Sequence, residues 1–202
     1  MKVLIFLASV LLPFQVCSQN IDISILRELN DPEYLVVDDF CRVFSGSEVF
    51  ISAGIPAGIA IAGLIRDDRK MIIDAGTIAA SSAITFIFST ALKYSVNRDR
   101  PFDRYPDIVK KMDVISPSFP SGHTSAAFST ATSVSLAYPE WYIIVPAYLW
   151  AGAVGYSRME LGVHYPSDVL AGAAIGAGTA FLSWKINQKL NEKRKHKPCN
   201  CP

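Results

Sequence analysis

The stretch FPSGHTSAAFSTATSVSLAYP, residues 119–139, decides the fold. A proline, a serine, a glycine and a histidine stand at its start. The residues that follow, 124–139, carry no charge and are mostly small. They lack the two-residue alternation of a half-buried strand, and the run has the length of a helix. The stretch therefore predicts an apolar helix that begins directly after a polar loop.

Four further charge-free apolar runs have the length of a helix: residues 49–65, 75–92, 141–157 and 169–184. A membrane-spanning helix needs about 20 apolar residues, with about 17 as the lower limit, so the five runs are at the short end of this range. We predict an all-α fold, a helical bundle of about five or six mostly transmembrane helices. The alternative is a soluble helical domain whose core helices are apolar on most sides.

Small residues support the membrane interpretation. Gly54 and Gly58 are four apart in one run, and Gly172 and Gly176 in another, a spacing that lets helices approach closely in lipid. Pro56 within an apolar run is also tolerated better in a membrane bundle than in an ordinary soluble helix.

Composition limits the class of partner. The chain has 202 residues, of which 50% are hydrophobic and 18% charged, and its net charge is +1. This length suits one domain. A charge so close to zero gives no reason to expect a nucleic-acid partner, so any anion site must be local.

The two ends of the chain differ from its middle. Residues 1–18 resemble a secretory signal peptide, with an uncleaved anchor as the alternative. Residues 19–48 form a polar, amphipathic segment with a break near Asp31-Pro32, residues 49–185 the helical domain, and residues 186–202 a basic tail. Cys199 and Cys201 in that tail are too few for a tetrahedral metal site.

A translocated N-terminus would place residues 20–48 and the loops 93–122 and 158–168 outside the membrane, with residues 66–70 and the tail 185–197 inside. Lysines and arginines are equally numerous on the two sides in this arrangement, so the orientation depends on the signal peptide alone.

Three cations share the predicted outer side with two histidines. Lys93, Arg100 and Arg158 can neutralise the nonbridging oxygens of a phosphoryl group. Ser121 and Gly122 precede a helix, whose free N–H groups and positive dipole end favour an anion. Any one of these residues could be an ordinary interface or capping residue, but that interpretation leaves their shared position unexplained.

The histidines supply the remaining parts of a displacement at phosphorus. Asp168 follows His164 by four residues and can hold its tautomer, which makes His164 the nucleophile. His123 then protonates the leaving oxygen and later takes a proton from water.

Three ordered blocks carry a resemblance to a known family. KYSVNRDRP gives a lysine, six residues and then Arg-Pro; PSGH gives the second block; SRMELGVHYPSD gives Ser-Arg, five residues, His, three residues and Asp. Together they resemble the signature of the type 2 phosphatidic acid phosphatase superfamily, with all eleven named positions present.

The resemblance implies a metal-independent phosphatase with a phosphohistidine intermediate and no cofactor. It assigns His164, Asp168 and His123 to catalysis. It assigns phosphate binding to five residues: Lys93, Arg100, Ser121, Gly122 and Arg158.

We expect an enzyme of the bacterial inner membrane, multi-pass, with its active site facing the periplasm. Its substrate would be a lipid phosphate or pyrophosphate: undecaprenyl pyrophosphate, phosphatidylglycerophosphate, phosphatidic acid or a lipid A phosphate. A soluble periplasmic acid phosphatase and a catalytically silent membrane scaffold or transporter are the alternatives. The oligomeric state is left open.

Overall fold

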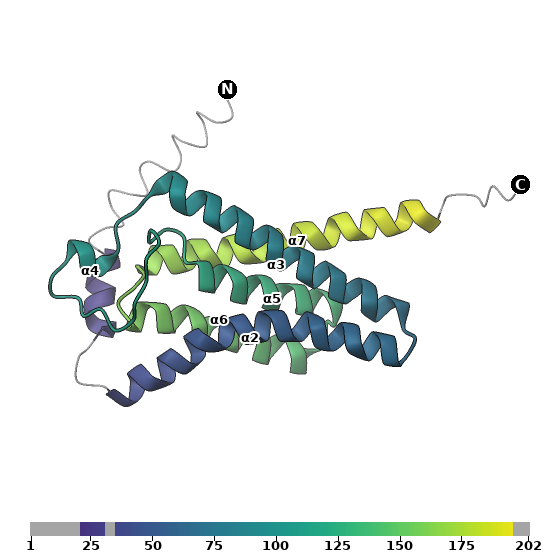
Figure 1. Ribbon diagram of the computed structural model, residues 1–202, viewed down its shortest axis with the longest axis horizontal. Coiled ribbons are helices and arrows are strands. Elements are labelled where there is room, and N and C mark those ends of the chain that lie inside the picture. The colour runs from purple at the N-terminus through teal and green to yellow at the C-terminus, as the bar shows by residue number, and fades with distance from the viewer. Residues whose placement is uncertain (1–20, 31–34, 196–202) are drawn as a thin grey trace, which may run out of the picture.

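The computed structural model describes residues 21–30 and 35–195, and in these ranges it contains helices and no strand (Figure 1). The signal-peptide region, Asp31-Pro32 and the two tail cysteines lie outside the described residues. A short helix covers residues 21–29. The other helices are α2 (Leu35–Ile65), α3 (Arg69–Val96), α4 (Pro101–Arg104), α5 (Gly122–Ala137), α6 (Trp141–Glu160) and α7 (Pro166–Lys195).

Each of the five apolar runs lies in one of the long helices, except that the run 124–139 extends two residues past the end of α5, so the predicted all-α bundle is confirmed. Two expected boundaries fall inside helices. The change from polar to apolar at residue 48 lies in the middle of α2, and the start of the basic tail at residue 186 lies inside α7. In the polar half of α2, Asp38 forms a buried ion pair with Lys111, 2.7 Å away.

Helix α5 occupies the centre and packs against α2, α3, α6 and α7 (Figure 1). Its serines, threonines and alanines are small enough for four neighbours to approach its axis. Their hydroxyl groups also join helices: Ser129 hydrogen-bonds Ser81 at 3.1 Å and accepts from Thr85 at 2.9 Å. Thr130 donates to Ser52 of α2 at 3.0 Å. The small-residue run therefore becomes the core of the bundle.

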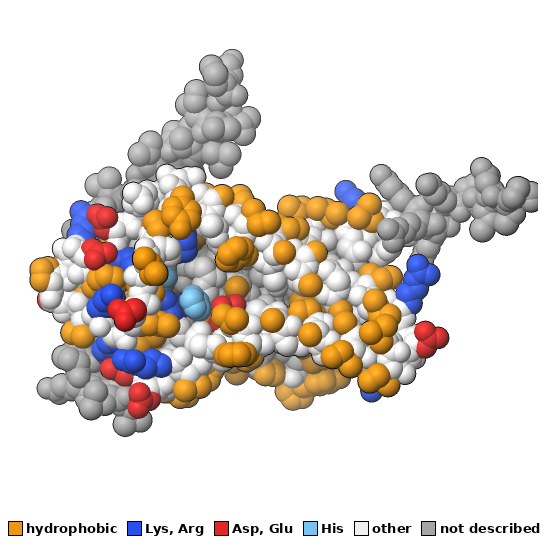
Figure 2. Space-filling model, in the orientation of Figure 1, with side chains coloured by type: hydrophobic (Ala, Val, Ile, Leu, Met, Phe, Trp, Pro, Cys, Tyr) orange, Lys and Arg blue, Asp and Glu red, His pale blue; other side chains and the backbone are white. Residues whose placement is uncertain are grey.

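Within residues 21–30 and 35–195, three helical segments are long and apolar enough to cross a membrane: Val37–Ile65, Arg69–Arg104 and Pro166–Glu192. Charged side chains gather at the two ends of the molecule, and the surface between them is mostly hydrophobic or uncharged (Figure 2). α5 and α6, which we also expected to span, are not among the three. α5 has 16 residues and is enclosed by its neighbours, so it needs no lipid-facing surface.

The two glycine pairs differ in how closely a neighbouring helix approaches them. A Cβ at Gly176 would lie 2.1 Å from the carbonyl oxygen of Ser125, and one at Gly172 would lie 2.7 Å from that of Ser121. α7 therefore approaches α5 closely at both glycines, as predicted. Gly54 and Gly58 have no atom within 4 Å of such a Cβ, so the expected close packing is wrong for them among the described residues.

The contact between α5 and α7 gives a stability test. We expect Gly176→Ala to lower the free energy of unfolding by about 1–3 kcal/mol, because the methyl group overlaps backbone atoms of α5. Gly178→Ala is the matched control, since nothing lies within 4 Å of its added Cβ and alanine favours the helix by up to about 1 kcal/mol. Unfolding in detergent micelles followed by tryptophan fluorescence measures both variants, and equal destabilisation would contradict the contact.

Candidate active site

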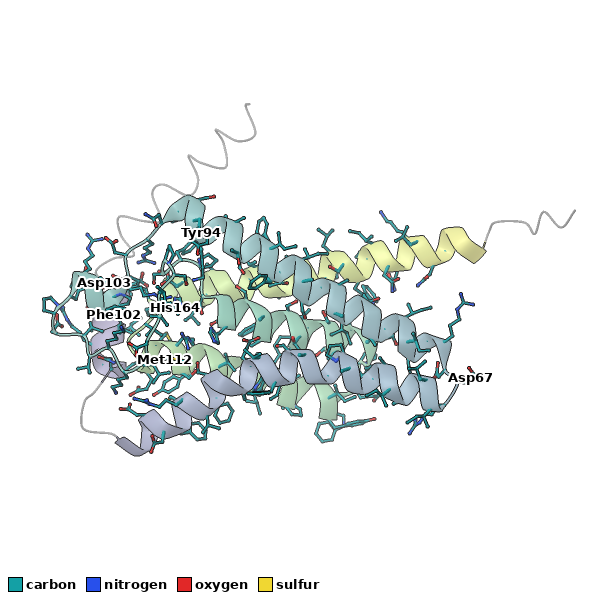
Figure 3. The ribbon with its side chains drawn as sticks, viewed as in Figure 1. Asp67, Tyr94, Phe102, Asp103, Met112 and His164 are labelled. Carbon is teal, nitrogen blue, oxygen red and sulfur yellow. The ribbon has the colours of Figure 1, made fainter. Side chains whose placement is uncertain are left out.

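The three predicted loops meet at one end of the bundle. His164 lies there with Phe102, Asp103 and Met112, while Asp67, in the turn between α2 and α3, lies at the opposite end (Figure 3). The structure therefore brings together blocks that are up to 75 residues apart in the chain, between Lys93 and Asp168.

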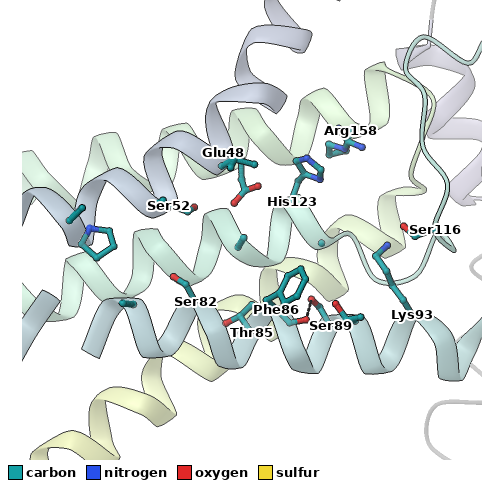
Figure 4. Close-up of a pocket in the computed structure, with 18 of the residues that line it drawn as sticks. Glu48, Ser52, Ser82, Thr85, Phe86, Ser89, Lys93, Ser116, His123 and Arg158 are labelled. Atoms are coloured by element: carbon teal, nitrogen blue, oxygen red, sulfur yellow. Dashed lines mark hydrogen bonds between the residues drawn. The ribbon is translucent and has the colours of Figure 1, made fainter. Parts of the chain in front are cut away.

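A cavity of about 1120 Å³ begins at this end and continues between α2 and α3 (Figure 4). Six of the eight predicted site residues line it: Lys93, Arg100, Gly122, His123, Arg158 and His164. Ser121 and Asp168 are fully buried and are not among the lining residues. The cavity thus presents three cations and two histidines to whatever enters it.

Two of the cations are held by carbonyl groups. Lys93 Nζ donates to the carbonyl oxygen of Pro117 at 2.8 Å. Arg100 donates to the carbonyl oxygens of Ser116, at 2.8 Å, and of Val163, at 2.6 Å. A carbonyl fixes the position of a cation without cancelling its charge, so both side chains keep a full charge for an anion.

Arg158 is the third cation and is only 1% exposed. Its Nη1 donates to the hydroxyl of Ser45 and lies 3.2 Å from the sulfur of Met112, whereas its Nε has no hydrogen-bond partner among the described residues. A buried guanidinium N–H without an acceptor is costly. A phosphoryl oxygen in the adjoining cavity would supply that acceptor.

His164 and Asp168 are paired as the sequence predicts. The Nδ1 atom of His164 lies 3.5 Å from Oδ2 of Asp168, without hydrogen-bond geometry. Its Nε2 lies 3.4 Å from Nη1 of Arg100, on the side of the phosphate-binding cations. Burial lowers the pKa of His164 to about 3, so the ring is neutral at physiological pH. Nε2 is the ring nitrogen that faces Arg100, and its role as the attacking atom stays a prediction.

The turn before α5 is arranged around Ser121. The Ser121 hydroxyl caps the helix by accepting from the N–H of Thr124, and the Ser121 N–H donates to the carbonyl oxygen of Asp168 at 3.1 Å. Ser121 thus holds the loop, and its assignment as a phosphate ligand stays a prediction. Gly122 lines the cavity, where an added Cβ would be 3.7 Å from Lys93, and its first-turn N–H has no helical partner.

Sequence reasoning missed the residues that hold Asp168. Arg98 donates to Oδ1 of Asp168 at 2.7 Å, and Ser118 donates to Oδ2. Arg98 also pairs with Asp22 of the N-terminal helix at 3.1 Å and lies over the ring of Tyr165. Arg98 stands between Lys93 and Arg100 in the first block, at a position to which the pattern assigns no role, and nothing in the sequence links it to Asp22.

A sequence profile of the PAP2 superfamily matches residues 74–192, which contain all the predicted site residues. This chain belongs to the PAP2 superfamily. The superfamily match confirms the resemblance drawn from the three blocks.

Individual relatives differ in how much of their length they share. An undecaprenyl-diphosphatase of Sulfolobus acidocaldarius is 33% identical over 111 residues, which are 54% of this chain and 53% of that protein, so this chain spans about half its length. A lipid A 4'-phosphatase of Bacteroides thetaiotaomicron is 26% identical over 183 residues, 86% of this chain and 80% of that protein. The crystal structure of Aquifex aeolicus LpxE superposes with a TM-score of 0.67 at 27% identity, covering 82% of this chain and 95% of that one.

Arg98 gives a test of the site in this PAP2 protein. We expect Arg98→Gln to lower kcat by about 10- to 100-fold, because Asp168 loses its cation and moves relative to His164. KM should change little, since Arg98 does not line the cavity. Arg98→Lys should restore part of kcat.

Arg69→Gln is the matched control, because it removes an exposed arginine from the opposite end of α3. A merely structural role for Arg98 would instead lower the amount of folded protein and leave kcat per folded molecule unchanged.

Proposed function

We propose that this chain is a metal-independent membrane phosphatase that hydrolyses a lipid phosphate or pyrophosphate through a phosphohistidine intermediate. One observation supports it most: a single cavity joins the cations and histidines to an apolar space between two lipid-facing helices, α2 and α3. A phosphoryl group and a hydrocarbon chain of one molecule fit such a cavity together. Two relatives are named as phosphatases of such molecules, a lipid A 4'-phosphatase and an undecaprenyl-diphosphatase.

The reaction needs two displacements. In the first, Nε2 of His164 attacks phosphorus, the bond to the leaving oxygen breaks, and His123, which the bound phosphoryl anion keeps protonated, donates its proton to that oxygen. In the second, His123 takes a proton from water, the water oxygen attacks phosphorus, and the bond to Nε2 breaks to release inorganic phosphate. Lys93, Arg100 and Arg158 stabilise the charge on the phosphoryl oxygens in both steps.

Asp168 acts on Nδ1 of His164, the ring nitrogen opposite the attacking Nε2. When Nε2 becomes bonded to phosphorus, the His164 ring becomes positive, and the carboxylate 3.5 Å from Nδ1 stabilises that charge. The described residues contain no group of three or more His, Cys, Asp or Glu that could hold a metal ion.

The soluble alternative fits this chain less well. Large hydrophobic side chains are exposed on the sides of the bundle, among them Phe50 at 79%, Phe86 at 70% and Leu170 at 71%. Patches of this kind mark membrane or protein interaction surfaces. The cavity also opens between two candidate spans rather than only at the end of the molecule.

A phosphate-release assay tests the proposal. Purified protein in detergent, with chelator present, should release phosphate from at least one of undecaprenyl diphosphate, phosphatidic acid, phosphatidylglycerophosphate and lipid A. His164→Ala should lower kcat by about 10⁴-fold or more, because the nucleophile is lost. Equal activity of the variant would exclude His164 as nucleophile, activity on soluble esters alone would favour the acid phosphatase, and no release at all would favour the silent scaffold.

We further propose that the active site faces the periplasm of a bacterial inner membrane. Asp103 is exposed at the active-site end, and Arg66 is exposed in the turn between α2 and α3 at the other end. In a protein whose own cysteines are replaced by serine, a membrane-impermeant thiol reagent applied to spheroplasts should label Asp103→Cys and not Arg66→Cys. Labelling of Arg66→Cys alone would place the active site in the cytoplasm.

A further inference from the structure

Glu48 is a carboxylate that the proposed reaction does not use. It lies on α2 within a candidate membrane span, lines the cavity and is 7% exposed. From residue 49 to the end of α2 no other side chain is charged. An ionisable residue at such a place is costly, and it usually marks a ligand pathway.

The protein offers Glu48 little compensation. Its polar neighbours are Ser52, one helical turn further along α2, and the guanidinium of Arg158. Arg158 donates instead to Ser45, and no lysine or arginine nitrogen within the described residues comes within the 4.0 Å of an ion pair with Glu48. A buried carboxylate needs hydrogen-bond donors. The cavity that it faces is where further donors can come from.

The position of Glu48 along the cavity indicates which part of a bound substrate supplies those donors. Arg158 and His123 lie on one side of it, where the phosphoryl group and the leaving oxygen bind (Figure 4). Pro56, Ala57 and Ala60 line the cavity further along α2, where the wall formed by this helix is apolar. Glu48 therefore faces the first atoms of the leaving group, between the phosphate ester and the lipid chains.

The side chains of α3 on the opposite wall of the cavity do not compete with Glu48 as acceptors. Ser82 and Ser89 of α3 donate their hydroxyl hydrogens to carbonyl oxygens of their own helix, at 3.2 Å each. Thr85 donates to the carbonyl of Ser81 or to Ser129. These hydroxyls are occupied within the bundle, so a donor on the substrate meets its strongest acceptor at Glu48.

We propose that Glu48 accepts a hydrogen bond from a hydroxyl or amide N–H of the leaving group, so that the site selects phosphate monoesters whose leaving group carries such a donor beside the ester, as an acylated amino sugar does. This inference rests on the proposed lipid phosphatase function and names its substrate class. A prenyl or diacylglycerol leaving group has no donor and leaves Glu48 with the Ser52 hydroxyl as its hydrogen-bond partner. A lipid diphosphate places its second phosphate beside the carboxylate, where like charges repel.

Two matched substrates test the inference. A 2-N,3-O-diacylglucosamine 1-phosphate and phosphatidic acid each carry two acyl chains and one phosphate, but only the sugar has free hydroxyl and amide donors. We expect the wild-type protein to prefer the sugar phosphate by about 10- to 100-fold in kcat/KM, which is the usual worth of a hydrogen bond to a charged group. Undecaprenyl diphosphate serves as the third substrate.

The variants should act on the two substrates differently. Glu48→Leu should lower kcat/KM for the sugar phosphate to the level of phosphatidic acid and leave phosphatidic acid unchanged. Glu48→Gln keeps an acceptor and loses the charge, so it should retain part of the preference and raise the rate with undecaprenyl diphosphate. Glu140→Gln, at the exposed start of α6, is the control and should change nothing.

The outcomes distinguish a failure of the role proposed for Glu48 from a failure of the proposed lipid phosphatase function. An unchanged preference in both Glu48 variants, or an equal loss on both substrates, would overturn the role of Glu48. Wild-type protein that hydrolyses no lipid phosphate would overturn the proposed function instead. If the variants do not fold, a sugar phosphate whose hydroxyl and amide hydrogens are replaced by methyl groups gives the same test on wild-type protein, since it should react no faster than phosphatidic acid.

Discussion

The buried carboxylate of Asp168 holds the active-site end together. Its side chain is fully buried and binds Arg98, Ser118 and the N–H of Tyr165, while its backbone carbonyl accepts from Ser121. A charge in this position is tolerated only with such partners. Through them one residue fixes the end of α3, the loop before α5, the histidine loop and the start of α7.

The three cations of the cavity follow a different rule. Lys93, Arg100 and Arg158 are all less than 10% exposed, and they are held by carbonyl groups, a hydroxyl and a sulfur rather than by carboxylates. Three like charges brought together this way destabilise the folded protein. Carboxylate partners would relieve that cost but would also compete with the phosphate. The site is therefore complementary to an anion at the expense of the stability of the free protein, as expected of functional sites.

The sequence predicts the parts of this structure that depend on local pattern. Apolar runs specify the helices, the three blocks specify His123, His164 and Asp168, and the spacing of Gly172 and Gly176 specifies a close helix contact. These features are visible because each is set by residues near one another in the chain.

The remaining features depend on which segments meet in space. Arg98 and Asp22 are 76 positions apart, and the loop carbonyls that hold Lys93 and Arg100 belong to backbone that any residue could supply. Gly54 and Gly58 have the same spacing as the α7 pair but meet no neighbour. The spacing in the sequence predicts which face of a helix carries small side chains. Whether another helix packs against that face depends on the fold.

If the substrate is a lipid phosphate, as we propose, the opening of the cavity between α2 and α3 explains why these cations are buried at all. A phosphatase for soluble esters can present its cations at an open surface, because the ester diffuses to them. A lipid phosphate cannot leave the bilayer without exposing its chains to water, at about 0.8 kcal/mol for each CH₂ group. The protein must instead carry the cations to the level of the headgroup and leave a lateral path for the chains. A cavity that changes from cationic at Arg158, to acceptor-bearing at Glu48, to apolar at Pro56 has this form, and its order is the one that our proposal requires for a phosphate, a hydrogen-bond donor and hydrocarbon chains along one molecule.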